Sequence, residues 1–289
     1  MGFWTDIPQH IDPVAFAVGS LSVRWYAVCF IGGYAALVAS LFRRLKRLVP
    51  PIDADTIWDV AVYVFLGVLI GGRLGFALFY EPDLFLNPVS LVWQIDPETG
   101  FFSGIRGMSF FGALIGATIA CYLFTKSRRI PFFRLTDFVV PSVPIALFFG
   151  RIGNFLNLEL PGRLTTVPWG VYFPNAIDGA WELRHPSQLY EAVLEGIVLY
   201  VVLNVLKKRS LPTGMLSFIF LSGYAIMRFL AENYREPDPG STMFFGWMTI
   251  GQAFSLVLLV VSVAAYILIV KRGVMCRKAA DVLCRKDPS

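Results

Sequence analysis

The chain has 289 residues, of which 56% are hydrophobic, and it carries a formal net charge of +5. Its mean hydropathy is +0.63. Ordinary soluble domains are only about 45–50% apolar. Runs of roughly twenty apolar residues recur along the chain, and this length crosses a bilayer core of about 30 Å. The composition therefore excludes an ordinary soluble domain.

The apolar runs predict membrane-spanning helices. Only helices and closed barrels satisfy their backbone polar groups in lipid, and these runs lack the alternation of barrel strands. We therefore expect an all-α polytopic membrane protein with about seven transmembrane helices and an extracytoplasmic cap. In chain order the predicted spans are 21–42, 57–80, 108–124, 136–156, 187–206, 214–230 and 249–270.

Basic residues between the spans predict the orientation of the chain. They gather after the first, third, fifth and seventh spans, and all four groups lie on one side if the spans alternate. By the positive-inside rule that side is cytoplasmic, so we expect the N-terminus outside and the C-terminus inside. The four groups are Arg43, Arg44, Lys46 and Arg47; Lys126, Arg128, Arg129 and Arg134; Lys207, Lys208 and Arg209; and Lys271, Arg272 and the basic tail.

The remaining segments predict one membrane domain over residues 1–289. Segments 81–107 and 157–186 are rich in Pro, Gly and aromatic residues, and each is expected to fold over the outer membrane surface as a cap. Residues 271–289 form a basic cytoplasmic tail. No Lys or Arg precedes Arg24, so the N-terminus lacks the basic region of a cleavable signal peptide and the first span is expected to stay in the mature protein.

Cysteine and histidine usage points away from a metal centre or a disulfide framework. Two of the four cysteines lie in apolar spans and two in the basic tail, with no zinc-site or disulfide spacing. The two histidines, His10 and His185, are far apart in the sequence. No basic stripe with interleaved aromatic residues indicates nucleic acid. We expect no metal, no cofactor and no nucleic-acid partner.

Four arginines lie inside or at the edge of predicted spans, all toward the outer ends. They are Arg24, Arg73, Arg151 and Arg228. A charge near the bilayer core costs a few kcal/mol, so such residues suggest function. Snorkelling to the outer headgroups or structural ion pairs are the alternative explanations.

Other polar residues follow the arginines along helix faces. Three helices each carry a polar stripe at the outer end, with spacings of three or four residues that place its members on one face. This arrangement predicts a solvated, cation-rich cavity that opens to the outer leaflet. Arginine binds phosphate through two hydrogen bonds of fixed geometry, so an anionic phospholipid headgroup fits. The stripes are Arg151, Asn154, Asn157 and Glu159; Gln188, Glu191 and Glu195; and Tyr224, Arg228, Glu232 and Arg235.

Several motifs resemble those of the bacterial phosphatidylglycerol–prolipoprotein diacylglyceryl transferases, in the order of that family and over nearly the whole chain. The longest is GRIGNFLNLELPGRLT, from Gly150 to Thr165. The others are RWY from Arg24 to Tyr26, GGRLGFALFY from Gly71 to Tyr80, RHPSQLYE from Arg184 to Glu191, and the ladder of Tyr224, Arg228 and Glu232.

The resemblance implies a reaction and its location. The family moves the diacylglyceryl group of phosphatidylglycerol to the thiol of the lipobox cysteine of a prolipoprotein. A thioether forms and glycerol phosphate leaves. This occurs at the outer face of the bacterial cytoplasmic (inner) membrane and needs no metal or organic cofactor. The implied partners are membrane phosphatidylglycerol and the prolipoprotein signal peptide.

The resemblance also implies residue roles. Arg151 and Arg228 match the essential arginines and are assigned to the phosphate, with Glu232 and Tyr26 as further catalytic candidates. The remaining expected substrate-binding residues are Asn154, Asn157, Glu159, Gly162, Glu191, Tyr224 and Arg73.

One position departs from the family pattern. The third span of the family usually begins HGGLIG, whereas this chain has FFGALIG from Phe110 to Gly116. Phe111 occupies the position of the histidine that is the usual candidate base, and phenylalanine cannot accept a proton. Either Glu232, Tyr26 or a water accepts it, or the protein is a paralogue of altered activity.

Two functions of other classes compete with the transferase. A lipid transporter would favour mid-membrane charges and paired broken helices from internal repeats, and the sequence has neither feature. A catalytically silent relative that binds anionic phospholipid or lipoprotein is supported only by Phe111.

Overall fold

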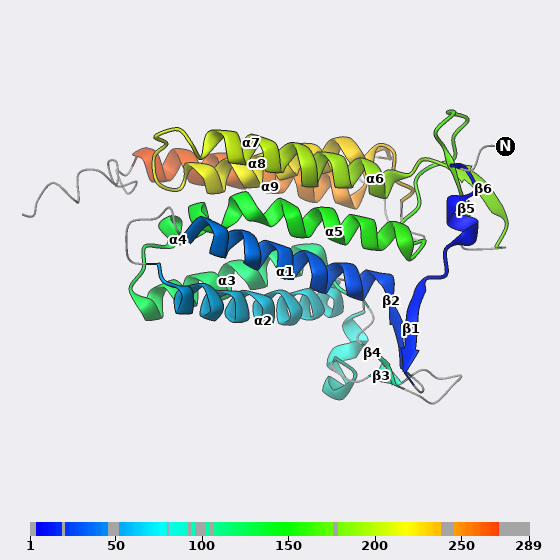
Figure 1. Ribbon diagram of the computed structural model, residues 1–289, viewed down its shortest axis with the longest axis horizontal. Helices are drawn as coiled ribbons and strands as arrows, with labels where there is room; N and C mark the ends of the chain where they lie inside the picture. Colours follow the sequence, from blue (N-terminus) through cyan, green and yellow to red (C-terminus); the bar gives the residue numbers. More distant parts are fainter. Residues whose placement is uncertain are drawn as a thin grey trace, which may run out of the picture. The chain divides into compact units, whose positions relative to one another are not determined.

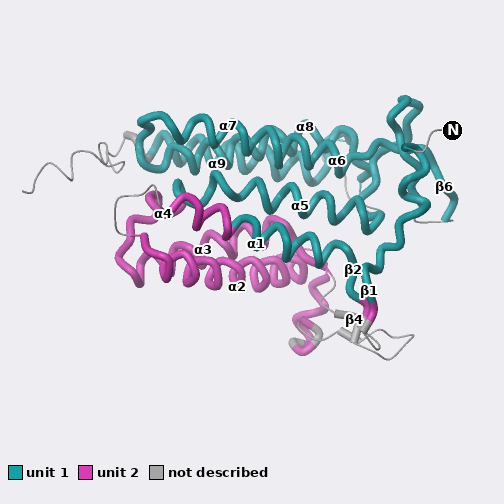
Figure 2. The backbone as a smooth tube through the Cα atoms, viewed as in Figure 1, with its two compact units in different colours: residues 1–16, 23–37, 137–289 teal, residues 17–22, 38–136 magenta. Residues whose placement is uncertain are grey.

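The computed structural model describes residues 4–18, 21–45, 52–79, 81–91, 94–95, 102–104, 107–175, 179–237 and 246–271. The chain forms two compact units (Figure 2). Unit 1 comprises residues 1–16, 23–37 and 137–289, and unit 2 comprises residues 17–22 and 38–136. Lys46, Arg47, Tyr80, Arg272 and the two tail cysteines lie outside the described residues, as do parts of the 81–107 segment.

Seven helical stretches within the described residues are long and apolar enough to cross a membrane, which confirms the predicted polytopic helical fold (Figure 1). Two of them are composite. The fourth joins α4, η4 and α5, and the fifth joins α6, the π-helix η5 and α7. The bounds are α1 Trp25–Leu45, α2 Ala54–Phe79, α3 Phe110–Arg128, α4 Phe132–Val139, η4 Val140–Ser142, α5 Val143–Leu156, α6 Ser187–Glu191, η5 Ala192–Val198, α7 Leu199–Leu206, α8 Met215–Glu232 and α9 Ile250–Lys271.

The first span begins four residues later than predicted. Leu21–Arg24 forms the strand β2, which pairs with β1, Val14–Val18. The sequence Leu-Ser-Val-Arg alternates apolar and polar residues, which is the period of a strand and not of a helix. Consequently Arg24 lies at the end of a strand, with its side chain exposed.

Within the described residues, two further small sheets and three short 3₁₀ helices lie outside the spans. β3 pairs with β4, and β5 pairs antiparallel with β6. The sequence analysis did not predict these elements, because each strand is too short to carry a clear alternation. Their bounds are η1 Ile7–His10, η2 Pro82–Phe85, η3 Pro88–Leu91, β3 Gln94–Ile95, β4 Phe102–Gly104, β5 Val171–Pro174 and β6 Trp181–Arg184.

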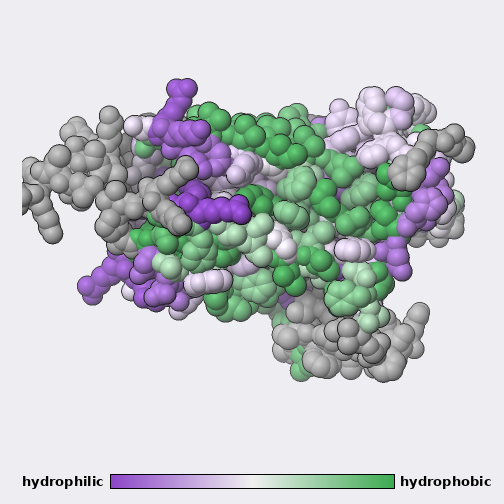
Figure 3. All heavy atoms as spheres, in the orientation of Figure 1, coloured by the Kyte–Doolittle hydropathy of each residue, from purple (hydrophilic) through white to green (hydrophobic). Residues whose placement is uncertain are grey.

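The helices expose apolar side chains on their outer faces. On the face seen in Figure 3, hydrophobic side chains cover the helices and hydrophilic ones gather toward the helix ends. Along α2, exposed residues recur every three or four positions. A continuous exposed apolar stripe of this kind suits contact with lipid tails. Its members are Trp58, Val62, Tyr63, Leu66, Ile70, Leu74 and Leu78.

In unit 2, α2 and α3 pack through glycines. A Cβ on Gly116 would overlap the carbonyl oxygen of Gly67 and lie 2.8 Å from the Cα of Gly71. A Cβ on Gly75 would lie 2.7 Å from the Cα of Gly112. Position numbers rise along one helix as they fall along the other, so the two helices are antiparallel. Small residues let helices approach closely where lipid supplies no hydrophobic driving force.

In unit 1, α8 contacts both α7 and α9. Val140, Leu199, Leu203, Phe220 and Tyr224 belong to the buried apolar cluster at the α7–α8 contact. The α8–α9 contact runs antiparallel, because Ser222 meets Ser262 through their hydroxyls while Glu232 meets Thr249.

An acidic residue from outside the helix caps the start of α8. The carboxylate of Asp137 in α4 accepts hydrogen bonds from the backbone N–H groups of Gly214, at 2.5 Å, and Ser217, at 2.9 Å. The first N–H groups of a helix have no partner within the helix. A carboxylate at this end accepts hydrogen bonds from them and interacts favourably with the helix dipole. This contact fixes where α8 begins relative to α4.

Beyond the end of α5, the backbone of residues 162–164 lies between two other backbone segments. Gly162 pairs with Arg235 on one side, and Leu164 pairs with Arg184 of β6 on the other. A Cβ on Gly162 would overlap the carbonyl oxygen of His185 and lie 2.7 Å from that of Tyr234. Only glycine fits where these three backbone segments meet so closely.

Candidate active site

Two buried arginines from different helices share one carboxylate. Glu191, at the end of α6, contacts Arg151 of α5 at 2.9 Å through Oε2, and its Oε1 accepts a hydrogen bond from Arg228 of α8. The side chain of Glu191 is 1% exposed, that of Arg228 is 10% exposed and that of Arg151 is 13% exposed. The structure thus brings together the two arginines that the sequence analysis assigned to phosphate.

A second carboxylate, Glu195, completes the environment of Arg151. Its Oε2 accepts hydrogen bonds from Arg151 Nε at 3.2 Å and Nη2 at 3.1 Å, and its side chain is fully buried. Glu195 lies in the π-helix η5, where Gly196 lets α5 approach so closely that a Cβ would lie 2.7 Å from that of Phe148. π-helical turns are rare and often mark functional sites.

The third carboxylate, Glu232, holds Arg228 from the end of α8. Its Oε2 lies 2.7 Å from Arg228 Nη2, and its Oε1 accepts a hydrogen bond from the hydroxyl of Thr249 at 3.1 Å. Tyr224, one turn before Arg228, is also buried and within electrostatic reach of both arginines. We call Arg151, Glu191, Glu195, Tyr224, Arg228 and Glu232 the charged cluster.

A hydrogen-bonded group of amides lies beside this cluster at the end of α5. Asn154 and Asn157 donate to the two carboxylate oxygens of Glu159, at 3.3 and 3.0 Å. The Asn157 side-chain oxygen accepts from the backbone N–H of Tyr26 at 3.0 Å. The Tyr26 phenol is within electrostatic reach of Arg151. These four predicted residues therefore form one network that adjoins the charged cluster.

The turn that carries Glu159 has an unusual backbone. Leu158 and Leu160, on either side of it, both have φ at 57°. Residues other than glycine rarely adopt this left-handed conformation, and it concentrates at functional sites. The side-chain amide of Gln188 donates to the Glu159 carbonyl at 2.6 Å, which ties this turn to α6.

The structure also describes the contacts of three further residues. Arg73 belongs to unit 2, where it donates to the carbonyls of Leu91 at 2.7 Å and Gly107 at 3.2 Å. Phe111, also in unit 2, is partly buried, and its ring meets Phe110 edge-on. His185 interacts with the Tyr190 hydroxyl at 3.1 Å, and partial burial lowers the pKa of this histidine.

The sequence analysis missed the contribution of the α9 N-terminal turn, residues Thr249–Gln252. Gln252 N donates to Thr249 Oγ1, and Thr249 N donates to Gln252 Oε1, each at 3.1 Å. This is a capping box. Its spacing, Thr-x-x-Gln before an apolar run, marks the start of a helix in the sequence, but no sequence signal indicates that the same threonine reaches Glu232.

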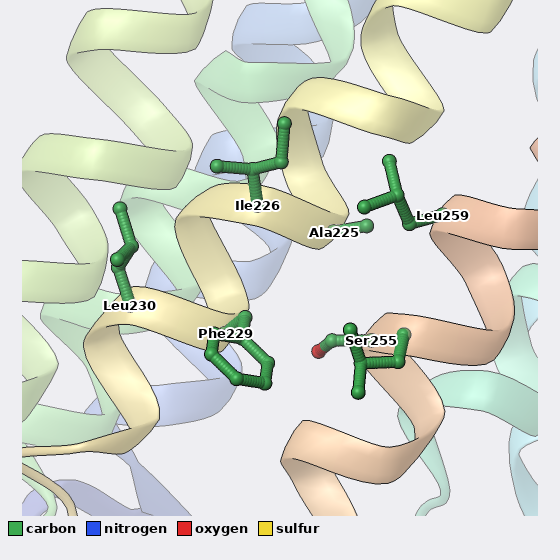
Figure 4. A pocket seen from close by; sticks show the side chains of 7 residues that line it. Ala225, Ile226, Phe229, Leu230, Ser255 and Leu259 are labelled. Atoms are coloured by element: carbon green, nitrogen blue, oxygen red, sulfur yellow. The ribbon is translucent and has the colours of Figure 1, made fainter. Parts of the chain in front are cut away.

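An apolar groove of about 110 Å³ lies between α8 and α9 (Figure 4). Ser255 follows Gly251 by four residues, so the groove continues along the same face of α9 from the Glu232 contact. Such a groove accommodates hydrocarbon. The lining residues are Ala225, Ile226, Phe229, Leu230, Ser255, Leu256 and Leu259.

Among the described residues, no group of three or more His, Cys, Asp or Glu side chains is placed to hold a metal ion.

Comparisons with known proteins identify the family of the chain. The family model described as prolipoprotein diacylglyceryl transferase matches residues 13–268. A phosphatidylglycerol–prolipoprotein diacylglyceryl transferase of Wolinella succinogenes is 43% identical over 88% of this chain and 91% of the relative. Relatives with the same name from Vibrio cholerae and Chlorobaculum tepidum are 41% and 40% identical, over 91% and 89% of this chain and 93% and 89% of their own length. The chain therefore belongs to the prolipoprotein diacylglyceryl transferase family.

Proposed function

We propose that this protein transfers the diacylglyceryl group of phosphatidylglycerol to the lipobox cysteine thiol of a prolipoprotein. The observation that carries the proposal is the pair of largely buried arginines, Arg151 and Arg228, bridged by Glu191. Each guanidinium has five N–H donors in a planar fork, which matches a phosphate. The apolar α8–α9 groove suits the hydrocarbon of a lipid substrate.

In the transfer step, the cysteine sulfur attacks the glyceryl carbon that bears the phosphate. The carbon–sulfur bond forms while the carbon–oxygen bond breaks, and the electron pair leaves on the oxygen of glycerol phosphate. The phosphate charge thus grows from one negative charge toward two. Arg151 and Arg228 interact more strongly with the transition state than with the ground state, and this difference accelerates the reaction.

Glu232 accepts the thiol proton in this proposal. In the structure Glu232 shares Arg228 with Glu191. An incoming phosphate competes for the Arg228 guanidinium, and the Glu232 carboxylate is then free to take a proton. Three carboxylates face two guanidiniums in the charged cluster. When an anionic phosphate enters, one added proton therefore reduces the repulsion between negative charges. Tyr26 and a water are the alternative acceptors.

The other predicted residues orient the substrate and the arginines. Asn154 and Asn157 hold the Glu159 carboxylate, and Asn157 also binds the backbone of Tyr26. Tyr224 borders the arginines, and Gly162 permits the close backbone contact that shapes the neighbouring loop. Arg73 is a further proposed substrate-binding residue.

We place the reaction at the outer face of the bacterial inner membrane. The protein is a multi-pass membrane protein, and its basic clusters assign the N-terminus to the outside and the C-terminus to the cytoplasm. The whole chain forms one membrane domain in this proposal, with segments 81–107 and 157–186 as its outer cap and residues 271–289 as its cytoplasmic tail.

The test incubates purified protein with phosphatidylglycerol liposomes and a lipobox peptide and follows the mass of the peptide. We expect the unchanged protein to add a diacylglyceryl group and Arg151→Ala to add none. Phe111→His runs beside them. If the unchanged protein fails and Phe111→His restores transfer, the chain is a silent relative. If no variant transfers but the protein moves lipid between leaflets, the transporter alternative holds.

A further inference from the structure

We propose that Thr249 and Gly251, in the α9 N-terminal turn, are positioning residues that hold the Glu232 carboxylate in place for proton transfer. The inference rests on the proposed function, in which Glu232 accepts the thiol proton. It concerns what keeps this carboxylate oriented when phosphate takes over Arg228.

The hydrogen-bond direction at Thr249 follows from its two partners. The backbone N–H of Gln252 can only donate, so Thr249 Oγ1 accepts this bond. The hydroxyl hydrogen is therefore left for the second partner, Glu232 Oε1, at 3.1 Å. The capping box thus aims one donor at one carboxylate oxygen. The Thr249 hydroxyl still binds Glu232 when Arg228 binds phosphate, because Thr249 belongs to α9 and Arg228 to α8.

Gly251 makes room for this contact. A Cβ at position 251 would lie 2.5 Å from Glu232 Oε1, 2.7 Å from Cδ and 2.9 Å from Oε2. All three atoms are the far end of a flexible side chain. Gly251→Ala would therefore leave the helix packing intact and displace the carboxylate from both Thr249 and Arg228. The glycine thus affects the position of Glu232 more than the fold.

The turn is itself fixed to the end of α8. Gln252 Nε2 donates to the side-chain oxygen of Asn233 at 3.2 Å, and Asn233 directly follows Glu232. Thr249, Gln252 and Glu232 are all buried. The distance between the donor and the carboxylate is thus set by two helix ends held together by side-chain hydrogen bonds.

The experiment compares transfer rates of Thr249→Val, Thr249→Ser and Gly251→Ala with the unchanged protein. We expect Thr249→Val to lower the turnover number about 10-fold or more, since it removes a hydrogen bond to a charged group. Thr249→Ser keeps the hydroxyl and should restore most of the activity. Gly251→Ala should lower turnover about 10²-fold, as expected for a misplaced catalytic group. KM for phosphatidylglycerol should change little in each.

Two controls separate positioning from a structural effect. Ser262→Ala removes a hydroxyl bond on the same α8–α9 contact but away from the charged cluster. Gly32→Ala adds a Cβ where nothing lies within 4 Å. Both should keep the rate of the unchanged protein.

A double-mutant cycle tests whether Thr249 acts on turnover through Glu232. In a Glu232→Gln background, Thr249→Val should cause no further loss of turnover, because its effect on turnover acts through Glu232, whereas the lost cap of α9 affects stability. Equal losses in both backgrounds would overturn the inference, as would full activity of Gly251→Ala. The proposed role of Glu232 fails separately, if Glu232→Gln alone retains the rate of the unchanged protein.

Discussion

At the residue scale, the charged cluster combines residues that each cost free energy alone. Moving a carboxylate or guanidinium out of water carries a penalty of several kcal/mol, which is offset only by well-placed partners. Glu191 is central because it binds both Arg151 and Arg228, whereas Glu195 hydrogen-bonds Arg151 and lies 3.9 Å from Arg228. The two glutamates are therefore not equivalent, although they are four residues apart and the sequence predicts that both lie on one helix face.

The difference between these glutamates predicts unequal stability losses. Glu191→Gln leaves two guanidiniums without their shared counter-charge and should lower the free energy of unfolding by about 3–5 kcal/mol. Glu195→Gln removes a surplus carboxylate while Arg151 keeps Glu191, so its cost should be about 1 kcal/mol or less. Unfolding in detergent, compared with the unchanged protein, measures both. Equal costs would contradict this account of the cluster.

The backbone contact around Gly162 leaves no room for a side chain. Gly162→Ala pushes a methyl group into the carbonyls of His185 and Tyr234, and neither carbonyl can move without breaking the strand-like pairing around it. We expect a loss of about 1–3 kcal/mol in unfolding free energy, as for other overpacked sites. Gly32→Ala, in open space, is the matched control for the thermal unfolding measurement. A neutral Gly162→Ala would show that the loop adapts.

At the element scale, the three carboxylates of the charged cluster lie where regular helices end or are interrupted. Glu191 closes α6, Glu195 lies in the π-helix η5, and Glu232 closes α8. Helix ends leave backbone groups available and allow side chains from several directions to converge. Likewise Asp137 and Thr249 each satisfy the start of a helix, α8 and α9 respectively.

The glycine contact in unit 2 makes an element-scale prediction. Gly116→Ala should separate α2 from α3, because its Cβ meets the backbone atoms of Gly67 and Gly71. The expected cost is about 1–3 kcal/mol of unfolding free energy. Ile115→Ala changes the neighbouring residue, which is 56% exposed, and should be nearly neutral. Thermal unfolding in detergent compares the two variants, and equal losses would argue against close backbone packing as the cause.

At the scale of the whole molecule, the chain combines lipid-facing helices with a buried ionic centre in unit 1. Apolar side chains are exposed on the outer helix faces, while the charged cluster is buried among α5, α6, α8 and η5. This is the reverse of a soluble protein, because lipid replaces water around the molecule while charges need partners inside.

The basic loops predict the orientation of the whole chain. A green fluorescent protein fused to the C-terminus should fluoresce, and alkaline phosphatase fused there should be inactive, because the basic clusters hold that end in the cytoplasm. Alkaline phosphatase fused in the loop after α5 should be active. The reverse pattern would invert the topology and place the charged cluster at the inner leaflet.

The sequence by itself determined the membrane class, the seven spans and the family. Length and apolarity suffice for the spans, because a bilayer imposes one element length and one way to satisfy the backbone. The family motifs and the polar stripes also identified Arg151, Arg228 and their carboxylates as a group. The orientation and the outer cap remain predictions.

Only the tertiary structure decided which of these residues touch. Arg73 and Arg151 look alike in sequence, yet Arg73 binds backbone carbonyls in unit 2 while Arg151 joins the charged cluster. The Thr-x-x-Gln spacing marks Thr249 as a helix start, but only the structure shows that its hydroxyl donates to Glu232. Periodicity reports the face of one helix, whereas such contacts depend on how separate helices pack, and packing is set by side chains distant in the sequence.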